Sequence, residues 1–205
     1  MSRRASMAAP GLWSAGWYRD ARRVPSPNFG ARPAGAVIDL AVVHSISLPP
    51  GVYGGDAIER LFTNRLDPAA HPSFAPLAGL QVSAHFVIRR DGACEQYVSV
   101  LDRAWHAGVS SWRGRPNCND RSLGVELEGL EGHAFEPAQY RTLSRLLRSA
   151  RARWPLHEVV GHEHIAPGRK RDPGPGFDWP RLARQLRGVA LEVPAARGWA
   201  PTGMA

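Results

Sequence analysis

Two histidines of this chain follow apolar sequence, at points where a buried strand would end. His44 closes the nearly continuous β-branched and apolar run 36–44, and His162 interrupts the apolar run 159–165. Because the carboxyl ends of neighbouring strands form a crevice in an open sheet, side chains at these ends can meet each other and a ligand. We therefore expect His44 and His162 to face one site, and neutral imidazole makes both of them candidate metal ligands.

A hydrolytic zinc site needs three protein ligands from His, Asp or Glu and keeps a fourth position open for water. Two residues compete for the third place. His164 lies two residues beyond His162, on the same face of the expected strand, and Asp172 lies ten residues beyond it in a loop rich in glycine and proline. The spacing alone does not decide between them.

Glu126 is the candidate proton acceptor beside such an ion. Residues 122–128 alternate with period two, so that Glu126 and Glu128 share the strand face opposite the apolar residues. This pair of carboxylates fits either the polar outer face of an edge strand or a strand that borders a cleft. In the second case Glu126 takes a proton from metal-activated water.

The loop between His162 and Asp172 contains Lys170, the single lysine of a chain that has 25 arginines. Arginine is a planar, permanently charged fork, whereas lysine is a compact ammonium whose pKa can be moved. Lys170 is therefore either a solvated loop charge or the group that stabilises the oxyanion of a tetrahedral intermediate.

The elements that must position these residues alternate along the chain. Strands are expected at 36–44, 82–90, 95–100, 122–128 and 159–165, with a hairpin turn at Asp91 and Gly92, and helices at 56–62, 137–154 and 178–189. This order predicts an α/β (α+β) fold with a mixed central sheet flanked by helices. We expect a flexible N-terminal segment at 1–16, a catalytic domain at 17–191 and a disordered tail at 192–205.

Composition restricts the class of protein. A length of 205 residues with 43% hydrophobic content suits one globular domain. Two cysteines are too few for a disulfide framework, no apolar run approaches the roughly 20 residues of a membrane span, and the first residues lack the apolar stretch of a secretory signal. We therefore expect a cytoplasmic protein that does not contact a membrane, and a monomer is favoured.

The net charge of +8 raises the question of nucleic-acid binding. Such binding predicts basic clusters interleaved with aromatic side chains, but the arginines between positions 141 and 153 fall on the outer side of an amphipathic helix. The charge therefore indicates solubility and compatibility with an acidic ligand, and we expect no nucleic-acid partner.

Six motifs occur in a fixed order between about residues 17 and 187. They are the segments 21–28, 42–51, 82–85, 103–110, 118–120 with 124–129, and 161–174. With these motifs the chain resembles the zinc-dependent N-acetylmuramoyl-L-alanine amidase family, and within it the AmpD type. The resemblance implies the fold of the amidases and peptidoglycan-recognition proteins.

The resemblance also implies roles for individual residues. His44, His162 and Asp172 match the ligands of one Zn²⁺ per chain, which favours Asp172 over His164. Glu126 matches the general base of the family, and Lys170 matches its transition-state stabiliser.

Trp105 and His106, in the fourth motif, are expected to contact substrate. The implied substrate is a muropeptide, cut at the amide that joins the lactyl group of (1,6-anhydro)-N-acetylmuramic acid to L-alanine, in cytoplasmic peptidoglycan recycling.

Three positions depart from the family pattern. Ser45 replaces an asparagine, and Gln81 and Asn117 replace arginines that could hold carboxylates of the peptide, so the peptide preference stays open. Two alternative functions also remain. An exported wall amidase needs an export signal, which the sequence does not show, and a non-catalytic recognition module predicts a damaged ligand set, which the sequence does not have.

Overall fold

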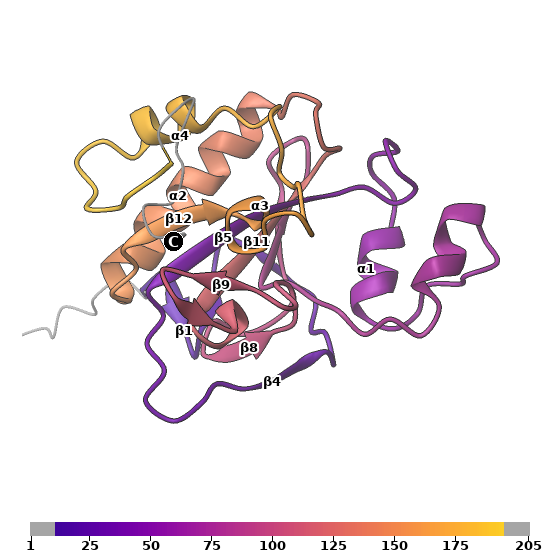
Figure 1. Ribbon diagram of the computed structural model, residues 1–205, viewed down its shortest axis with the longest axis horizontal. Coiled ribbons are helices and arrows are strands. Elements are labelled where there is room, and N and C mark those ends of the chain that lie inside the picture. The colour runs from indigo at the N-terminus through magenta and orange to yellow at the C-terminus, as the bar shows by residue number, and fades with distance from the viewer. Residues whose placement is uncertain (1–10, 195–205) are drawn as a thin grey trace, which may run out of the picture.

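A six-stranded mixed sheet forms the centre of the computed structural model, which describes residues 11–194 (Figure 1). The strands lie in the order β12-β5-β11-β6-β7-β3. Their bounds are Glu158–Gly161 for β12, Leu40–Ile46 for β5, Ser122–Glu128 for β11, Phe86–Ile88 for β6, Cys94–Gln96 for β7 and Arg22–Arg23 for β3.

Four neighbouring strands of the sheet are parallel. Strand β5 pairs with both β12 and β11, and β11 also pairs with β6, so the carboxyl ends of these strands meet at one edge. Strand β7 runs antiparallel to β6 through the hairpin predicted at residues 91 and 92, and β3 pairs with β7 in parallel. The register places Glu126 opposite His44, which sends both side chains to the same face of the sheet.

Helices cover both faces of this sheet. The long helix α2 (Pro137–Arg153) and the shorter α4 (Trp179–Gln185) lie together on one side of it (Figure 1). The remaining helices are α1 (Ala57–Phe62), α3 (His162–Ile165) and the 3₁₀ turns η1 (Pro72–Leu77) and η2 (Cys118–Asp120). The predicted mixed sheet flanked by helices is confirmed.

Helix α2 shows why the sequence folds this way locally. Pro137 occupies the first turn, where its missing N–H costs nothing, and Glu136 and Gln139 form a reciprocal capping box. The helix ends at Arg153, and Trp154, its extended C-cap residue, precedes Pro155.

The two faces of the sheet carry different side chains. The face under α2 carries the largest apolar cluster, which includes Ala41 and Val43 of β5 together with the leucines of α2. Leu40 and Val42 point the other way into a smaller cluster. His44 continues this second row by the two-residue period of a strand, so the polar site lies on the face opposite α2.

Three short strand pairs complete the fold around the main sheet. They are β1 (Trp13–Ser14) with β2 (Trp17–Tyr18), β4 (Phe29–Ala31) with β8 (Asp102–Ala104), and β9 (Ser111–Trp112) with β10 (Arg115–Pro116).

Two strand predictions near the site were wrong in their bounds. Strand β5 runs two residues past His44, so this histidine lies inside the strand and not at its end. Strand β12 stops at Gly161, and the chain turns into α3 at His162. The expected strand at 159–165 therefore does not continue to His164, and the two histidines do not share a strand face.

The ends of the described region pack on the domain. Within the expected flexible segment, the Trp13 indole nitrogen donates to Ser149 Oγ at 2.6 Å, and its ring meets Trp154 edge-on at 4.6 Å between centroids. At the other end, the Glu192 carbonyl accepts from the Val159 N–H. The rest of the expected segment and tail, residues 1–10 and 195–205, lies outside the described residues, and the domain limits stay predictions.

None of the helices between residues 11 and 194 is both long enough and apolar enough to cross a bilayer.

Candidate metal centre

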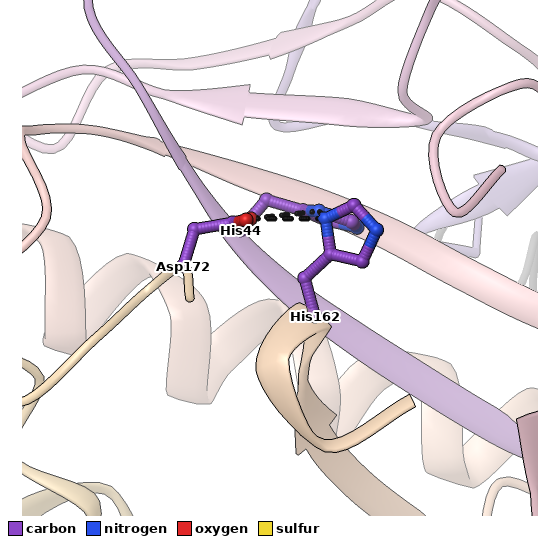
Figure 2. Close-up of side chains that lie close together, drawn as sticks. All are labelled: His44, His162 and Asp172. Carbon is purple, nitrogen blue, oxygen red and sulfur yellow. Dashed lines mark hydrogen bonds and ion pairs between the residues drawn. The ribbon is translucent and has the colours of Figure 1, made fainter. Parts of the chain in front are cut away.

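Three side chains from separate elements converge on one point (Figure 2). His44 comes from β5, His162 from the first turn of α3, and Asp172 from the loop that follows α3. The two Nδ1 atoms of the histidines are 2.9 Å apart, and the Asp172 Oδ2 atom lies 3.2 Å from His44 Nδ1 and 3.1 Å from His162 Nδ1.

These separations suit the ligands of a small cation. Two ligands bound about 2.0–2.1 Å from a tetrahedral zinc ion are roughly 3.3 Å apart. Two imidazole nitrogens and one carboxylate oxygen are also the donor set of hydrolytic zinc sites, which keep a fourth position open. The three residues therefore form a group that could hold a metal ion.

Hydrogen bonding presents the Nδ1 lone pair of His162 to this point. Its Nε2 atom lies 3.1 Å from the Ala107 carbonyl oxygen, which can only accept, and 3.4 Å from Arg169 Nη2, so the shorter contact assigns the proton of the neutral ring to Nε2. The Nδ1 atom is then without a proton and faces the Asp172 carboxylate. A cation between these two electron-rich atoms would remove their repulsion. In metal sites, a hydrogen bond from the other ring nitrogen to a carbonyl commonly fixes the tautomer of the ligating histidine in this way.

Burial keeps His44 neutral. The side chain is almost fully buried, and the loss of hydration, followed by the charge of His162, lowers its pKa to about 4. A neutral imidazole has a lone pair to offer to a metal at pH 7. Burial disfavours the charged form of Asp172, but its contacts with His162 and His44 outweigh this and hold its pKa below the usual range.

His164, the alternative third ligand, points elsewhere. Its Nδ1 atom accepts the Gly161 N–H at 2.8 Å, and its ring lies 5.5 Å from that of Trp179. The turn into α3 separates its direction from that of His162, and the group in residues 11–194 that could hold a metal ion contains Asp172 instead.

Glu126 stands beside the three residues on the neighbouring strand. Its register partner is His44, and its Oε2 atom is buried without a hydrogen-bond partner among the described residues. Loss of hydration, then the charge of Asp172, raises its pKa well above the ordinary value, and the charge of Lys170 lowers it in part. A carboxylate in this condition has a strong affinity for a proton.

Lys170 lies at an exposed position in the loop between His162 and Asp172. It lines an open pocket of about 360 Å³ together with Ser45, Arg171 and Asp172. Its charge acts on both His44 and Glu126, which places it within electrostatic reach of the candidate centre. The structure thus brings Lys170 and all four of the other main site residues together.

Trp105 and His106 have different surroundings. Trp105 is partly buried, and its indole nitrogen is buried without a hydrogen-bond partner in the described part of the chain. His106 lies behind His44, with 2.9 Å between its Nδ1 and His44 Nε2. The sequence reasoning missed this contact with His44, because the two residues are 62 positions apart and no spacing rule connects them.

The other histidines have no part in this group. His85 is fully buried, and its nitrogens contact the Gly124 N–H and the Asp102 carbonyl. His71, His133 and His157 are exposed, as the sequence predicts.

Comparison with known proteins identifies the family. The family described as N-acetylmuramoyl-L-alanine amidase matches residues 34–175, which include all five main site residues. The chain is 54% identical over 169 residues to a protein of Salmonella typhimurium (strain SL1344) named 1,6-anhydro-N-acetylmuramyl-L-alanine amidase AmpD, and the match covers 82% of this chain and 90% of that protein.

Solved structures agree. A crystal structure of a selenomethionine derivative of AmpD is 52% identical, covers 84% of this chain and 97% of its own, and superposes with a TM-score of 0.82. The amidase AmiD from E. coli, in complex with anhydro-N-acetylmuramic acid-L-Ala-D-γ-Glu-L-Lys, is 32% identical with a TM-score of 0.53, over 75% of this chain and 60% of its own. The fold and family expected from the motifs are confirmed, and the chain belongs to the N-acetylmuramoyl-L-alanine amidase family of hydrolases.

Proposed function

We propose that this protein is a zinc hydrolase that cleaves the amide between the lactyl carbonyl of (1,6-anhydro)-N-acetylmuramic acid and the nitrogen of L-alanine. One observation carries the proposal. Two imidazole nitrogens and a carboxylate oxygen face one point, beside a half-buried glutamate whose buried Oε2 has no partner within residues 11–194, in a chain about half identical to AmpD amidases.

We assign His44, His162 and Asp172 as the ligands of one zinc ion. When bound, zinc supplies a Lewis acid that polarises a carbonyl and acidifies water. The neutral state of His44 and the charged state of Asp172 both favour binding of a divalent cation.

We assign Glu126 as the general base. Its raised pKa lets it accept the proton of the attacking water, and a nearby cation lowers that pKa in part. The water oxygen forms a bond to the lactyl carbon, and the bond from this carbon to nitrogen breaks. Glu126 returns its proton to the leaving nitrogen, so the products are a carboxylic acid and a peptide with a free amino group.

We assign Lys170 to the negative charge that develops on the carbonyl oxygen. A positive charge placed there before the reaction favours the transition state over the neutral amide. The pocket that it lines beside Asp172 offers room for the substrate around the scissile bond. Trp105 remains a proposed substrate contact.

The names of the related proteins and the ligand in one related structure support the proposed substrate class. The AmpD proteins are named for 1,6-anhydro-N-acetylmuramyl-L-alanine, and the AmiD complex holds an anhydro-muramyl peptide. We therefore propose an anhydro-muropeptide as the substrate, cytoplasmic recycling of wall fragments as the setting, and residues 17–191 as the catalytic domain.

A product assay tests this function. The purified chain is incubated with anhydro-N-acetylmuramic acid-L-Ala-D-γ-Glu-L-Lys or with intact wall, with and without a chelator, and products are identified by mass. We expect anhydro-N-acetylmuramic acid and the free tripeptide from the soluble fragment, no products with chelator, and recovery on addition of zinc. Faster release from intact wall indicates a wall amidase, and binding without products indicates a recognition module; each contradicts the proposal.

The ligand assignment has its own test. Asp172→Ala is expected to lose bound zinc, measured by elemental analysis of the purified protein, because one of three ligands is gone. Glu131→Ala is the control, since Glu131 lines the same pocket and pairs with Arg171 but lies outside the group of three. Equal zinc content in the two variants excludes Asp172 as a ligand.

A further inference from the structure

Two hydrogen bonds run from His44 away from the candidate centre to strand β11. The Nε2 atom of His44 lies 2.9 Å from His106 Nδ1, and the Nε2 atom of His106 lies 3.0 Å from Ser122 Oγ. Ser122 is fully buried. His44 therefore uses one ring nitrogen for the candidate centre and the other for this chain of bonds.

The fold holds the His106 ring in place. A Cβ atom at Gly124 would lie 2.5 Å from His106 Cγ and Cδ2, so glycine at this position of β11 lets the ring lie directly on the strand. The Asn119 Oδ1 atom accepts the backbone N–H groups of His106 and Ala107, which fixes the approach of the loop. The arrangement is built from three separate segments, and substrate plays no part in it.

The proton positions are inferred from the two groups that meet His162 Nε2: the Ala107 carbonyl, which can only accept, at 3.1 Å, and Arg169 Nη2 at the longer distance of 3.4 Å. The Ala107 carbonyl places the proton of His162 on Nε2, so His162 Nδ1 has none. Without a metal, the proton between the two Nδ1 atoms belongs to His44, which donates it toward His162 and Asp172. The Nε2 atom of neutral His44 then accepts from His106 Nδ1–H, and His106 Nε2 accepts from the Ser122 hydroxyl.

A metal at the centre reverses these bonds. His44 must then offer the Nδ1 lone pair, so its proton sits on Nε2 and is donated to His106 Nδ1. The proton of His106 moves to Nε2 and is donated to Ser122 Oγ. His44, His106 and Ser122 hold one exchangeable proton each in both states, so the reversal changes neither their charge nor the number of bonds.

We propose that His106 and Ser122 are positioning residues that form a reversible hydrogen-bond relay, which holds the His44 ring and follows its change of tautomer when metal binds. This rests on the proposed metal site and adds Ser122 to the residues that act on it. It also gives His106 a role in place of the expected contact with substrate.

Nitrogen NMR of the ¹⁵N-labelled full chain tests the relay directly, with and without zinc. We expect His106 to carry its proton on Nδ1 in the metal-free protein and on Nε2 in the zinc form. His85 is the internal control, because its Nδ1 accepts the Gly124 N–H and its proton should stay on Nε2 in both forms. A His106 tautomer that does not change with zinc overturns the proposal.

A matched pair of variants tests the positioning role through zinc affinity, measured by competition with a chelator. His106→Leu removes both ring nitrogens. Asparagine has nearly the same shape as leucine, but His106→Asn keeps a polar atom near the position of Nδ1. Loss of an outer hydrogen-bond partner typically weakens metal binding by about 10–100-fold. We expect this loss for the leucine variant and a few-fold change for the asparagine variant, and equal affinities contradict the proposal.

Thermal unfolding of the metal-free variants shows whether each one folds. Should the leucine variant not fold, Ser122→Ala carries the test, because it removes the far partner and leaves His106 in place. We expect it to weaken zinc binding by a few-fold, because His106 Nε2–H of the zinc form loses its acceptor, and to leave the metal-free tautomer of His106 unchanged, because His44 Nε2 still accepts from His106 Nδ1–H. Zinc affinity equal to that of wild type refutes the relay. Wild-type protein that binds no zinc, or His44→Ala that binds zinc normally, refutes the proposed metal site itself.

Discussion

Glu126 and Glu128 lie two residues apart on β11 and leave the same face of the strand, yet their surroundings differ. Glu128 is 2% exposed, and its Oε1 accepts from the Gly54 N–H at 2.7 Å and from Arg89 Nη1 at 3.1 Å. Its Oε2 lies 3.3 Å from the Arg90 N–H. Glu126 has His44 as its register partner on β5, and its buried Oε2 has no partner within residues 11–194.

The region around Glu128 is a network of ion pairs. Arg89 joins Glu128 to Glu95, and Glu95 also contacts Arg22 and the Tyr97 hydroxyl. Both oxygens of Glu128 and of Glu95 therefore have hydrogen-bond or ion-pair partners. The strand thus carries two carboxylates of the same kind; the neighbours of Glu128 satisfy its oxygens, whereas Glu126 keeps a buried oxygen without a partner within residues 11–194, as the proposed base requires.

The largest expected effect comes from Glu126→Gln. Glutamine keeps the shape but cannot accept the proton of water, so we expect kcat to fall by roughly 10²–10⁴-fold. Bound zinc, measured by elemental analysis, should be unchanged, because Glu126 is not in the ligand group. Turnover near the wild-type value removes Glu126 as the base and with it the contrast between the two glutamates.

The cations near the two glutamates also differ in how many partners they have. Arg89 is held by two carboxylates, whereas the Lys170 ammonium forms no ion pair within the described residues. We expect Lys170→Met to lower kcat by about 10²–10³-fold, the typical loss for one oxyanion-stabilising donor. Arg171→Met, which removes the exposed neighbouring charge, is the control. Equal effects of the two variants mean that Lys170 acts only through general charge.

Glu128→Gln probes the structural member of the pair. The substitution weakens the bond to Arg89 and leaves part of the Arg89 charge without compensation, so we expect a loss of about 1–3 kcal/mol in the free energy of unfolding. Urea denaturation measures this loss, and kcat of the folded variant should remain within a few-fold of wild type. A large drop in kcat with unchanged stability would exchange the roles of the two glutamates.

The smallest expected effect concerns His85, a buried histidine that, unlike His44, lies outside the candidate metal centre. Burial, followed by the charge of Arg32, lowers the pKa of His85 to about 3. Between about pH 6.5 and pH 3 the unfolded chain therefore binds a proton at His85 that the folded chain does not. Its contribution to stability is complete above pH 6.5 and is lost as the pH falls.

The matching measurement is urea denaturation at pH 7 and pH 5. The His85 contribution to the loss between these values is about 2 kcal/mol, and His85→Asn should show a loss smaller by that amount. His157→Asn, at an exposed position, should lose as much as wild type. The same pH dependence in all three proteins contradicts the low pKa of His85.

Local patterns were sufficient for much of the fold. The alternation of residues 122–128 placed β11 correctly, the turn at Asp91 and Gly92 placed the β6–β7 hairpin, and the proline after Glu136 placed the start of α2. These features depend on neighbours a few residues apart, which the sequence displays directly. The end of β12 was wrong because the turn into α3 depends on packing against distant residues.

By itself, the sequence determined the family, through six ordered motifs, and the residue types of the candidate site. The spacing of His164 and Asp172 left the third ligand open, because the direction of a loop residue depends on contacts far along the chain. The tertiary structure alone brought Asp172 to the two histidines, gave Glu128 its partners while leaving Glu126 without them, and set His106 behind His44. The physical reason is that hydration, hydrogen bonding and pKa depend on the neighbours of a side chain in space, and residues 62 to 128 positions apart become neighbours only on folding.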